Sequence, residues 1–182
     1  LRCRLVFNLT DRTALVTGAG RGVGLGIARV LIDAGAHVYV NDLEPDRAMT
    51  AAADLGERAL ALPFDVTDLE AVTTSLAAVA PVDVLVNNAG YHARGPVETV
   101  GAGDLGRMID VNLKAPIMLT RLVLPHLREA GGGAVINVGS LAGRTPVPGS
   151  ACYAASKAGL RSFTYSLGYE LADSNIKLAV VS

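Results

Sequence analysis

Short runs of apolar, often β-branched residues alternate along the chain with longer segments whose apolar residues recur at helical spacing. The short runs are mostly too apolar to be strands with one face in water, which is typical of parallel strands buried on both faces. They predict strands at residues 13–17, 37–41, 59–64, 82–87, 134–138 and 176–181. Helices are expected at about residues 22–34, 46–55, 68–79, 102–129 and 151–173.

Strands that alternate with helices predict an α/β fold. We expect a doubly wound parallel sheet of six strands, covered by helices on both faces in three αβα layers. Right-handed crossovers place a ligand crevice at the carboxyl ends of such strands, near the point where the strand order reverses. No linker or internal repeat interrupts the pattern, so residues 1–182 are expected to form a single domain.

The composition argues against several classes of partner. The 16 Lys and Arg residues balance 17 Asp and Glu residues, so binding to nucleic acid or to an anionic membrane is not expected. No stretch approaches the ~20 apolar residues that are needed to cross a bilayer. Cys3 and Cys152 lie far apart, and the three histidines lack metal-ligand spacing. We therefore expect a reducing, cytoplasmic location and no metal site.

A glycine-rich turn with the sequence TGAGRGVG, residues 17–24, joins the first strand to the first helix. That context is typical of a loop whose backbone N–H groups bind a pyrophosphate. Asp42 ends the second strand 24 residues after Gly18, at the position where a carboxylate accepts hydrogen bonds from the adenosine ribose. Because a carboxylate repels a 2′-phosphate, Asp42 favours NAD over NADP. Arg21 lies within the glycine turn and leaves NADP as the alternative.

A second group of polar residues follows the fifth strand. Ser140 comes directly after that strand, and Tyr153 and Lys157 lie one turn apart in the next helix. Because residues at i and i+4 share a helix face, we expect the ammonium of Lys157 to favour the ionised form of the phenol. Tyr153 would then exchange a proton with an alcohol or carbonyl substrate, while Ser140 orients the substrate oxygen.

Taken in order, these motifs resemble the short-chain dehydrogenase/reductase family of nicotinamide-dependent oxidoreductases, and the resemblance covers residues 10–182. It implies a Rossmann-type fold and hydride transfer between the nicotinamide and a secondary alcohol or ketone. Tyr153 would be the acid/base, and Ser140 would stabilise the reacting oxygen. Lys157 would hold the nicotinamide ribose, and Asn112 would position a proton-relay water. The expected cofactor-binding residues are Gly18, Arg21, Gly22, Val23, Gly24, Asp42, Leu43, Asp65, Val66, Asn88, Ala89, Gly90, Tyr153 and Lys157.

The family's pattern continues beyond Ser182, so we expect an incomplete chain that lacks the substrate lid and the last strand. The substrate is a small alcohol or carbonyl compound that the sequence does not identify. The two longest predicted helices resemble the family's dimer-forming pair, which favours a homodimer or homotetramer. Two other interpretations stay open. One is an NADP-linked 3-oxoacyl-carrier-protein reductase, and the other is a non-catalytic dinucleotide-binding module or an inactive truncated remnant.

One alternative enzyme class and two further residues, His92 and Cys152, also have to be interpreted. Gly139-Ser140 lacks the G-x-S-x-G spacing of a serine hydrolase, and every histidine precedes Ser140, so a hydrolase is not expected. His92 is interpreted as a solvated loop residue rather than part of a substrate mouth. Cys152 is interpreted as a small buried thiol rather than a reactive one.

Overall fold

The computed structural model of the chain describes residues 8–182, so Cys3 lies outside the described residues. The chain forms two compact units that meet at the bond between Asn88 and Ala89. The prediction of a single domain over residues 1–182 stays a prediction. In the described residues, no helix combines the length and apolar character that a membrane span requires.

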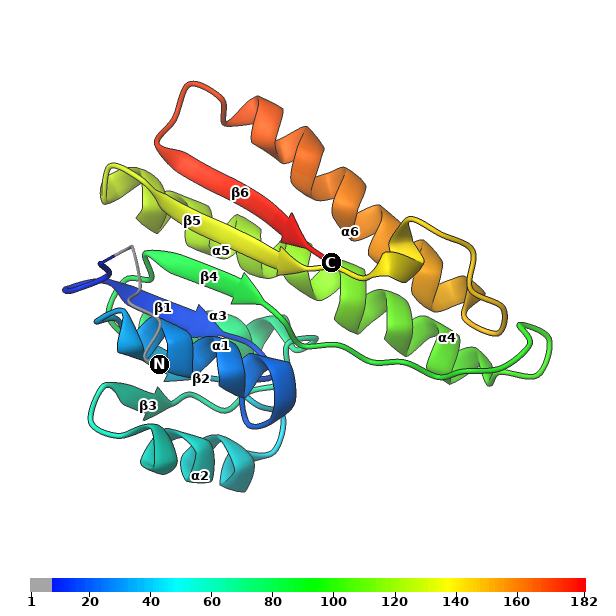
Figure 1. The fold of residues 1–182 in the computed structure, drawn as a ribbon, viewed down its shortest axis with the longest axis horizontal. Helices are drawn as coiled ribbons and strands as arrows, with labels where there is room; N and C mark the ends of the chain where they lie inside the picture. The colour runs from blue at the N-terminus through cyan, green and yellow to red at the C-terminus, as the bar shows by residue number, and fades with distance from the viewer. Residues whose placement is uncertain (1–7) are drawn as a thin grey trace, which may run out of the picture. The chain divides into compact units, whose positions relative to one another are not determined.

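The first unit, which ends at Asn88, is built on four parallel strands (Figure 1). They are β1 (Thr13–Val16), β2 (His37–Val40), β3 (Ala59–Ala61) and β4 (Val84–Asn87), arranged in the order β3-β2-β1-β4. The helices are α1 (Gly22–Asp33), α2 (Pro45–Leu55) and α3 (Leu69–Ala77). The strand order reverses at β1, because the chain adds β2 and β3 on one side and β4 on the other. The reversal is the point at which such sheets bind ligands.

The central strands of this unit are almost completely buried. Ala14, Leu15 and Val16 of β1 have no exposed surface, and β4 is buried along its whole length. Burial on both faces explains why these strands are continuous apolar runs in the sequence. In Figure 1, α1 lies in front of the strands and α3 behind them, as right-handed crossovers require.

The third strand is shorter than predicted. The sequence pattern predicts a strand at residues 59–64, but β3 ends at Ala61. Pro63 has no N–H to donate to the sheet. The carbonyl oxygens of Leu62 and Phe64 instead accept hydrogen bonds from the side chain of Asn41, at 3.1 and 3.0 Å. The segment after Ala61 therefore leaves the sheet and is anchored to the end of β2.

The second unit, Ala89–Ser182, contains two parallel strands, β5 (Gly133–Val138) and β6 (Ile176–Val181). Its helices are α4 (Ala102–Ile109), α5 (Ala115–Glu129) and α6 (Ala151–Glu170), with a short 3₁₀ turn at Leu141–Gly143. Together with the first unit, these elements supply the six parallel strands and flanking helices of the predicted α/β fold class, which is confirmed.

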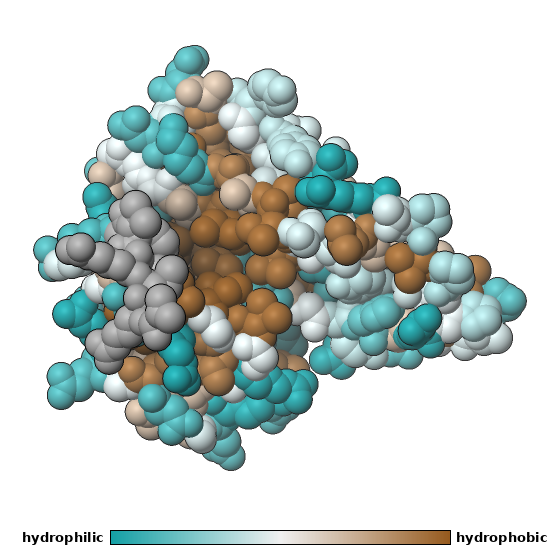
Figure 2. Space-filling model, in the orientation of Figure 1, coloured by the Kyte–Doolittle hydropathy of each residue, from teal (hydrophilic) through white to brown (hydrophobic). Residues whose placement is uncertain are grey.

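One face of the β5–β6 pair carries apolar side chains that helices do not cover. Ile136 and Val138 of β5 are half-buried, while Ala179 and Val181 of β6 are exposed. Figure 2 shows hydrophobic surface gathered over these two strands. On the opposite face, Asn137 is fully buried and donates a hydrogen bond to Thr164 of α6 at 2.8 Å.

The long helix predicted at residues 102–129 is interrupted. Between α4 and α5, residues Asp110–Lys114 form a single π-helical turn. Such turns insert one extra residue into a helix and are frequent at functional sites. Asn112 lies in this turn and is completely buried. Helical periodicity does not predict the irregularity, because the apolar spacing continues through it.

Candidate functional site

The glycine turn after β1 has the geometry of a phosphate-binding loop. Gly18 has φ +62°, a conformation that side chains disfavour. A Cβ at Gly24 would collide with the carbonyl oxygen of Gly18 and with Asn88 Nδ2. Arg21 precedes α1 in extended conformation and makes no side-chain cap, so the first N–H groups of the helix have no side-chain partner there. These features fit an anionic pyrophosphate group.

Asn88 holds the glycine turn against the end of β4. Its side-chain amide donates to the carbonyl oxygens of Thr17 and Gly18, at 2.8 and 3.1 Å, and its backbone N–H donates to Thr17 Oγ1. Asn88 therefore acts on the predicted cofactor turn through the backbone of that turn. Ala89 and Gly90, the other two residues predicted from the same motif, begin the second unit.

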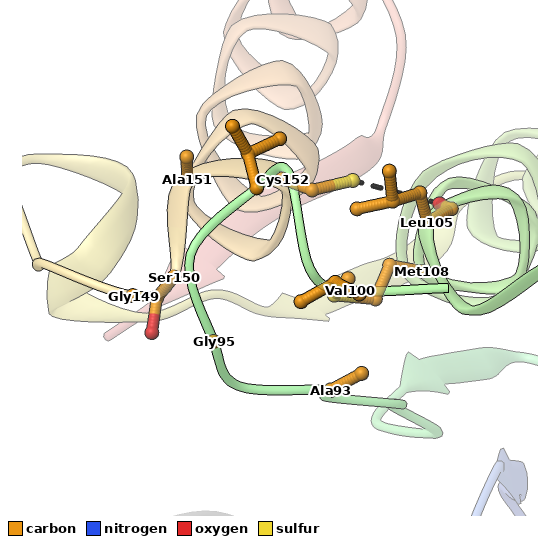
Figure 3. A pocket seen from close by; sticks show the side chains of 10 residues that line it. Ala93, Gly95, Val100, Leu105, Met108, Gly149, Ser150, Ala151 and Cys152 are labelled. Atoms are coloured by element: carbon orange, nitrogen blue, oxygen red, sulfur yellow. Dashed lines mark hydrogen bonds between the residues drawn. The ribbon is translucent and has the colours of Figure 1, made fainter. Parts of the chain in front are cut away.

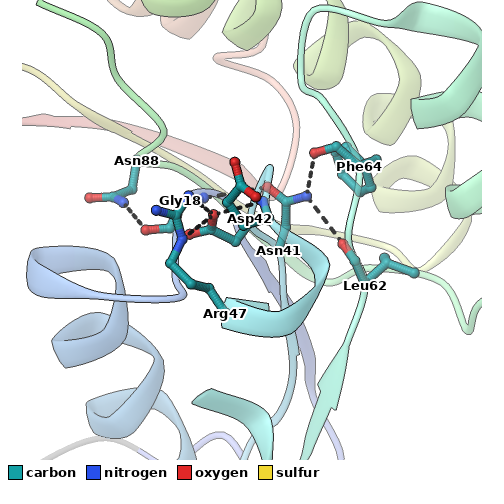
Figure 4. Close-up of polar contacts among 8 residues, drawn as sticks. Gly18, Asn41, Asp42, Arg47, Leu62, Phe64 and Asn88 are labelled. Atoms are coloured by element: carbon teal, nitrogen blue, oxygen red, sulfur yellow. Dashed lines mark hydrogen bonds and ion pairs between the residues drawn. The ribbon is translucent and has the colours of Figure 1, made fainter. Parts of the chain in front are cut away.

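Asp42 occupies the predicted ribose position, where β2 ends, and it is 5% exposed. Figure 4 shows its carboxylate facing the guanidinium of Arg47. Arg47 Nε and Nη2 donate to Asp42 Oδ1 at 3.0 and 2.7 Å. The adjacent Asn41 bonds to the carbonyl oxygens that follow β3 and to the N–H of Gly18, and its backbone carbonyl accepts the N–H of Ala19 at 2.7 Å. The end of β2 thus fixes both the acid and the glycine turn.

The remaining cofactor candidates of the first unit lie at the start of α1 or on loops. Val23 and Leu43 are large apolar residues left 68% and 45% exposed, an exposure that suits contact with a ligand. Asp65 accepts the N–H and hydroxyl of Thr67, and Asp68 caps α3 by accepting the N–H groups of Glu70 and Ala71. Val66, between them, is half-buried.

In the second unit, α6 presents the predicted phenol and ammonium on one face. The ammonium nitrogen of Lys157 lies 6.0 Å from the ring centroid of Tyr153 and donates to the carbonyl oxygen of Val138 at 2.8 Å. Lys157 is 5% exposed, and this burial lowers its pKa from 10.5 to about 8. Loss of water disfavours the charged ammonium, which accounts for the direction of the shift.

Ser140 lies where β5 passes into the 3₁₀ turn. Its oxygen accepts the N–H of Ala142 at 3.2 Å, which leaves the hydroxyl proton available for a substrate oxygen. The turn packs tightly on α6, because a Cβ at Gly143 would lie 2.8 Å from the backbone of Lys157. The serine is therefore held to the same helix that carries Tyr153.

Asn112 is a structural link between three segments. Its Oδ1 accepts the N–H of Tyr91 at 2.8 Å, while its Nδ2 donates to the carbonyl of Tyr91 and to Ser156 Oγ. Ser156 in turn donates to the carbonyl oxygen of Tyr153 at 2.7 Å. The side chain of Asn112 is thus occupied by protein groups, and it connects the π turn to the backbone of the predicted acid/base.

Two tyrosines lie in this region, and they differ in environment. Tyr91 donates its hydroxyl to Asp104, and this hydrogen bond raises the pKa of Tyr91 above its ordinary value of 10.0. A carboxylate acceptor favours the protonated phenol, which makes Tyr91 a poor acid/base. Tyr153 has an ammonium on its ring side instead of a carboxylate, and it is the phenol that the family motif selects.

His92 is exposed but is ordered against the catalytic candidates. Its ring centroid lies 4.3 Å from that of Tyr153, and its Nε2 lies 3.1 Å from Ser150 Oγ. His92 is thus the exposed loop residue that was expected, and its contacts with Tyr153 and Ser150 are an addition that the sequence carries no signal for. Beside Ser150, a small and mostly apolar pocket lies between the loop at Gly95 and the start of α6 (Figure 3).

Cys152 lines this pocket. It is half-buried, and its thiol is directed at the carbonyl oxygen of Leu105 at 3.5 Å. The thiol is therefore less buried than the interpretation of a small buried thiol expected. Among residues 8–182, no three His, Cys, Asp or Glu side chains gather closely enough to hold a metal ion.

The sequence reasoning missed three residues that support the site: Arg47, Asn41 and Ser156. Arg47 could have been found, since a cation five residues after the acid lies on the first turn of the next helix. The roles of Asn41 and Ser156 have no local signal, because each bonds to a segment more than twenty residues away.

Comparisons with known proteins agree with these features. The family model described as "short chain dehydrogenase" matches residues 12–182. The ketoacyl reductase HetN of Nostoc sp. is 37% identical over 95% of this chain, and the galactitol 2-dehydrogenase of Agrobacterium fabrum is 36% identical over 96%. A crystal structure of a gluconate 5-dehydrogenase from Burkholderia cenocepacia with NADP and tartrate superposes with TM-score 0.89, at 34% identity over 96% of the chain.

The chain covers only part of each of these proteins. It spans 63% of the length of the ketoacyl reductase, 70% of the galactitol dehydrogenase and 71% of the gluconate dehydrogenase. On this chain the family match runs over residues 12–182, a range that contains the candidate site.

Proposed function

The chain belongs to the short-chain dehydrogenase family of oxidoreductases that act on alcohol and carbonyl groups, and from that premise we propose NAD-dependent oxidation or reduction of a secondary alcohol or ketone. The observation that carries this proposal is the arrangement on α6. Tyr153 and Lys157 lie on one face of that helix. The segments that bear Ser140 and Asn112 are anchored to the same helix through Gly143 and Ser156.

Each of these residues has a role that follows from its contacts. Tyr153 exchanges a proton with the substrate oxygen, and Ser140 donates its hydroxyl proton to that oxygen. Lys157 keeps positive charge beside the phenol below its pKa of about 8. Asn112 is a positioning residue, since its side chain holds Tyr91 and Ser156. A bound nicotinamide dinucleotide supplies or accepts the hydride.

The first unit supports the choice of NAD. The glycine turn packs closely on itself and on Asn88, because a substituent at Gly24 would strike the carbonyl oxygen of Gly18 and Asn88 Nδ2, and this close packing suits a turn that binds a pyrophosphate through its backbone. Asp42 offers a carboxylate oxygen, Oδ2, to the ribose hydroxyls, because the hydrogen bonds from Glu44 and Arg47 are all accepted by Oδ1. A carboxylate at the ribose repels a 2′-phosphate, which favours NAD.

The test is hydride transfer measured as absorbance of the reduced nicotinamide, with secondary alcohols in one direction and a panel of ketones in the other. We expect turnover with NAD, and we expect titration calorimetry to show saturable NAD binding. Binding without turnover on any substrate would favour the non-catalytic module. Absence of binding would refute the proposal.

An NADP-linked 3-oxoacyl-carrier-protein reductase is the second candidate. It is favoured by the similarity to a ketoacyl reductase and to a gluconate 5-dehydrogenase whose structure contains NADP. In this chain, Arg21 is an exposed cation in the glycine turn. A kcat/KM that is higher with NADP than with NAD, measured on a β-ketoacyl thioester, would select this candidate.

A further inference from the structure

Asp42 is held in an asymmetric way. Its Oδ1 accepts three hydrogen bonds, from Arg47 Nε, from Arg47 Nη2 and from the backbone N–H of Glu44 at 3.1 Å. The side chain of Asp42 is 7% exposed and that of Arg47 is 37% exposed. The ion pair is therefore anchored on the buried acid, while part of the guanidinium remains in water.

The other oxygen of the carboxylate faces the glycine turn. A Cβ at Gly20 would lie 2.5 Å from Asp42 Oδ2 and 3.0 Å from the Cβ of Arg47. The acid and the arginine thus both contact the backbone of the turn that is proposed to hold the pyrophosphate. Oδ2 is the acceptor that remains on this side, and Arg47 is the cation next to it.

We propose that Arg47 is a specificity-determining residue of the cofactor site. It fixes Asp42 through Oδ1, and it supplies the positive charge that lets the site accept an adenosine ribose with a 2′-phosphate as well as one with free hydroxyls. This inference rests on the proposed function. It implies that the site prefers NAD but also binds NADP.

The physical argument compares the two ligands. Ribose hydroxyls need an acceptor, which Oδ2 provides whether or not Arg47 is present. A 2′-phosphate is a dianion beside a buried carboxylate, and it is tolerated only if a cation compensates the repulsion. A guanidinium has five N–H donors, and Asp42 uses two of them. The donors that remain suit the oxygens of a phosphate.

The test measures the binding of 5′-AMP and of adenosine 2′,5′-bisphosphate by titration calorimetry, so that no substrate is needed. Arg47→Ala should weaken the bisphosphate at least about tenfold, while 5′-AMP changes less than about threefold. Arg47→Lys keeps the charge but loses the planar fork that bonds to Asp42 and phosphate together, so its affinity for the bisphosphate should fall between those of the parent chain and Arg47→Ala. The same pattern is expected for NADP and NAD.

Arg12→Ala is the matched control. Arg12 also pairs with an aspartate at 2.8 Å, but it precedes β1 and so lies at the strand end opposite the glycine turn. We expect it to change neither affinity. Equal effects of Arg47→Ala on both probes, or a selective loss caused by Arg21→Ala alone, would overturn the role of Arg47 while leaving the proposed function intact. Failure of the parent chain to bind either probe would overturn both.

Discussion

At the scale of single residues, the proposed chemistry depends on the phenol of Tyr153. Tyr153→Phe keeps the ring that stacks on His92 at 4.3 Å but removes the proton. We expect kcat to fall by roughly 10²–10⁴, the usual contribution of a general acid or base, with the Kd of NAD almost unchanged. Tyr165→Phe, on the same helix with the phenol exposed, is the control and should keep full activity. A Tyr153→Phe variant as active as the parent would contradict the assignment.

Because Lys157 is buried, the free energy of unfolding is expected to depend on pH. Its pKa is about 8 in the folded chain, against an ordinary value of 10.5. Between these values the unfolded chain binds more protons than the folded one, so this group makes the free energy of unfolding rise as pH increases from about 8 to 10.5. Urea denaturation of the parent and of Lys157→Met across this range should show the rise only in the parent. Parallel curves would contradict burial of the ammonium.

At the scale of elements, the glycine turn and α1 give a matched pair of substitutions. At Gly24 a methyl group would strike the backbone of Gly18, so Gly24→Ala should destabilise the fold by about 2 kcal/mol or more and abolish NAD binding. Gly26 is two residues further along α1 and has no neighbour within 4 Å of an added Cβ. Gly26→Ala should stabilise the chain by about 0.5–1 kcal/mol. Thermal unfolding and NAD calorimetry measure both effects, and equal effects would refute the close approach.

The π turn is a second element with a measurable role. Asn112→Ala would leave the buried backbone groups of Tyr91 without partners, at a cost of about 2–4 kcal/mol. We expect kcat to fall as well, because the link through Ser156 to the helix of the acid/base is lost. Asn175→Ala removes one hydrogen bond at an exposed position and should cost less than about 0.5 kcal/mol. If the two variants unfolded at the same urea concentration, this role of Asn112 would be excluded.

At the scale of the whole molecule, we expect association of copies through α6. Tyr169 is 86% exposed on this helix, and Tyr165 is exposed one turn before it, with the guanidinium of Arg161 5.0 Å from its ring. Aromatic and arginine side chains of this kind are enriched at protein interfaces. Light scattering should show a dimer or tetramer, and Tyr169→Asp should shift it toward monomer. Met49→Asp, a similarly exposed apolar position on α2, should leave the mass unchanged. A parent chain that is monomeric at all concentrations would refute the proposal.

The parts of the fold that sequence reasoning predicted are those with local causes. Helical and strand periods follow from the geometry of the backbone, so the six strands and most helix positions can be read from the spacing of apolar residues. The pairing of Tyr153 with Lys157 is a relation between neighbours one helical turn apart. The position of Asp42 relative to the glycine turn follows from the length of one strand–helix–strand unit.

Tertiary structure alone decided the contacts that join distant segments. Asn88 bonds to Thr17 across 71 positions of the chain, and Asn112 bonds to Ser156 across 44. The anchoring of the segment after β3 depends on the side chain of Asn41, which no local propensity reports. The orientation of the Asp42 carboxylate is set by Arg47 together with the backbone of the glycine turn. Local spacing determines which functional groups lie on each element. Their partners are determined by tertiary packing, because a buried polar group has to form a hydrogen bond with whichever group the fold places within reach.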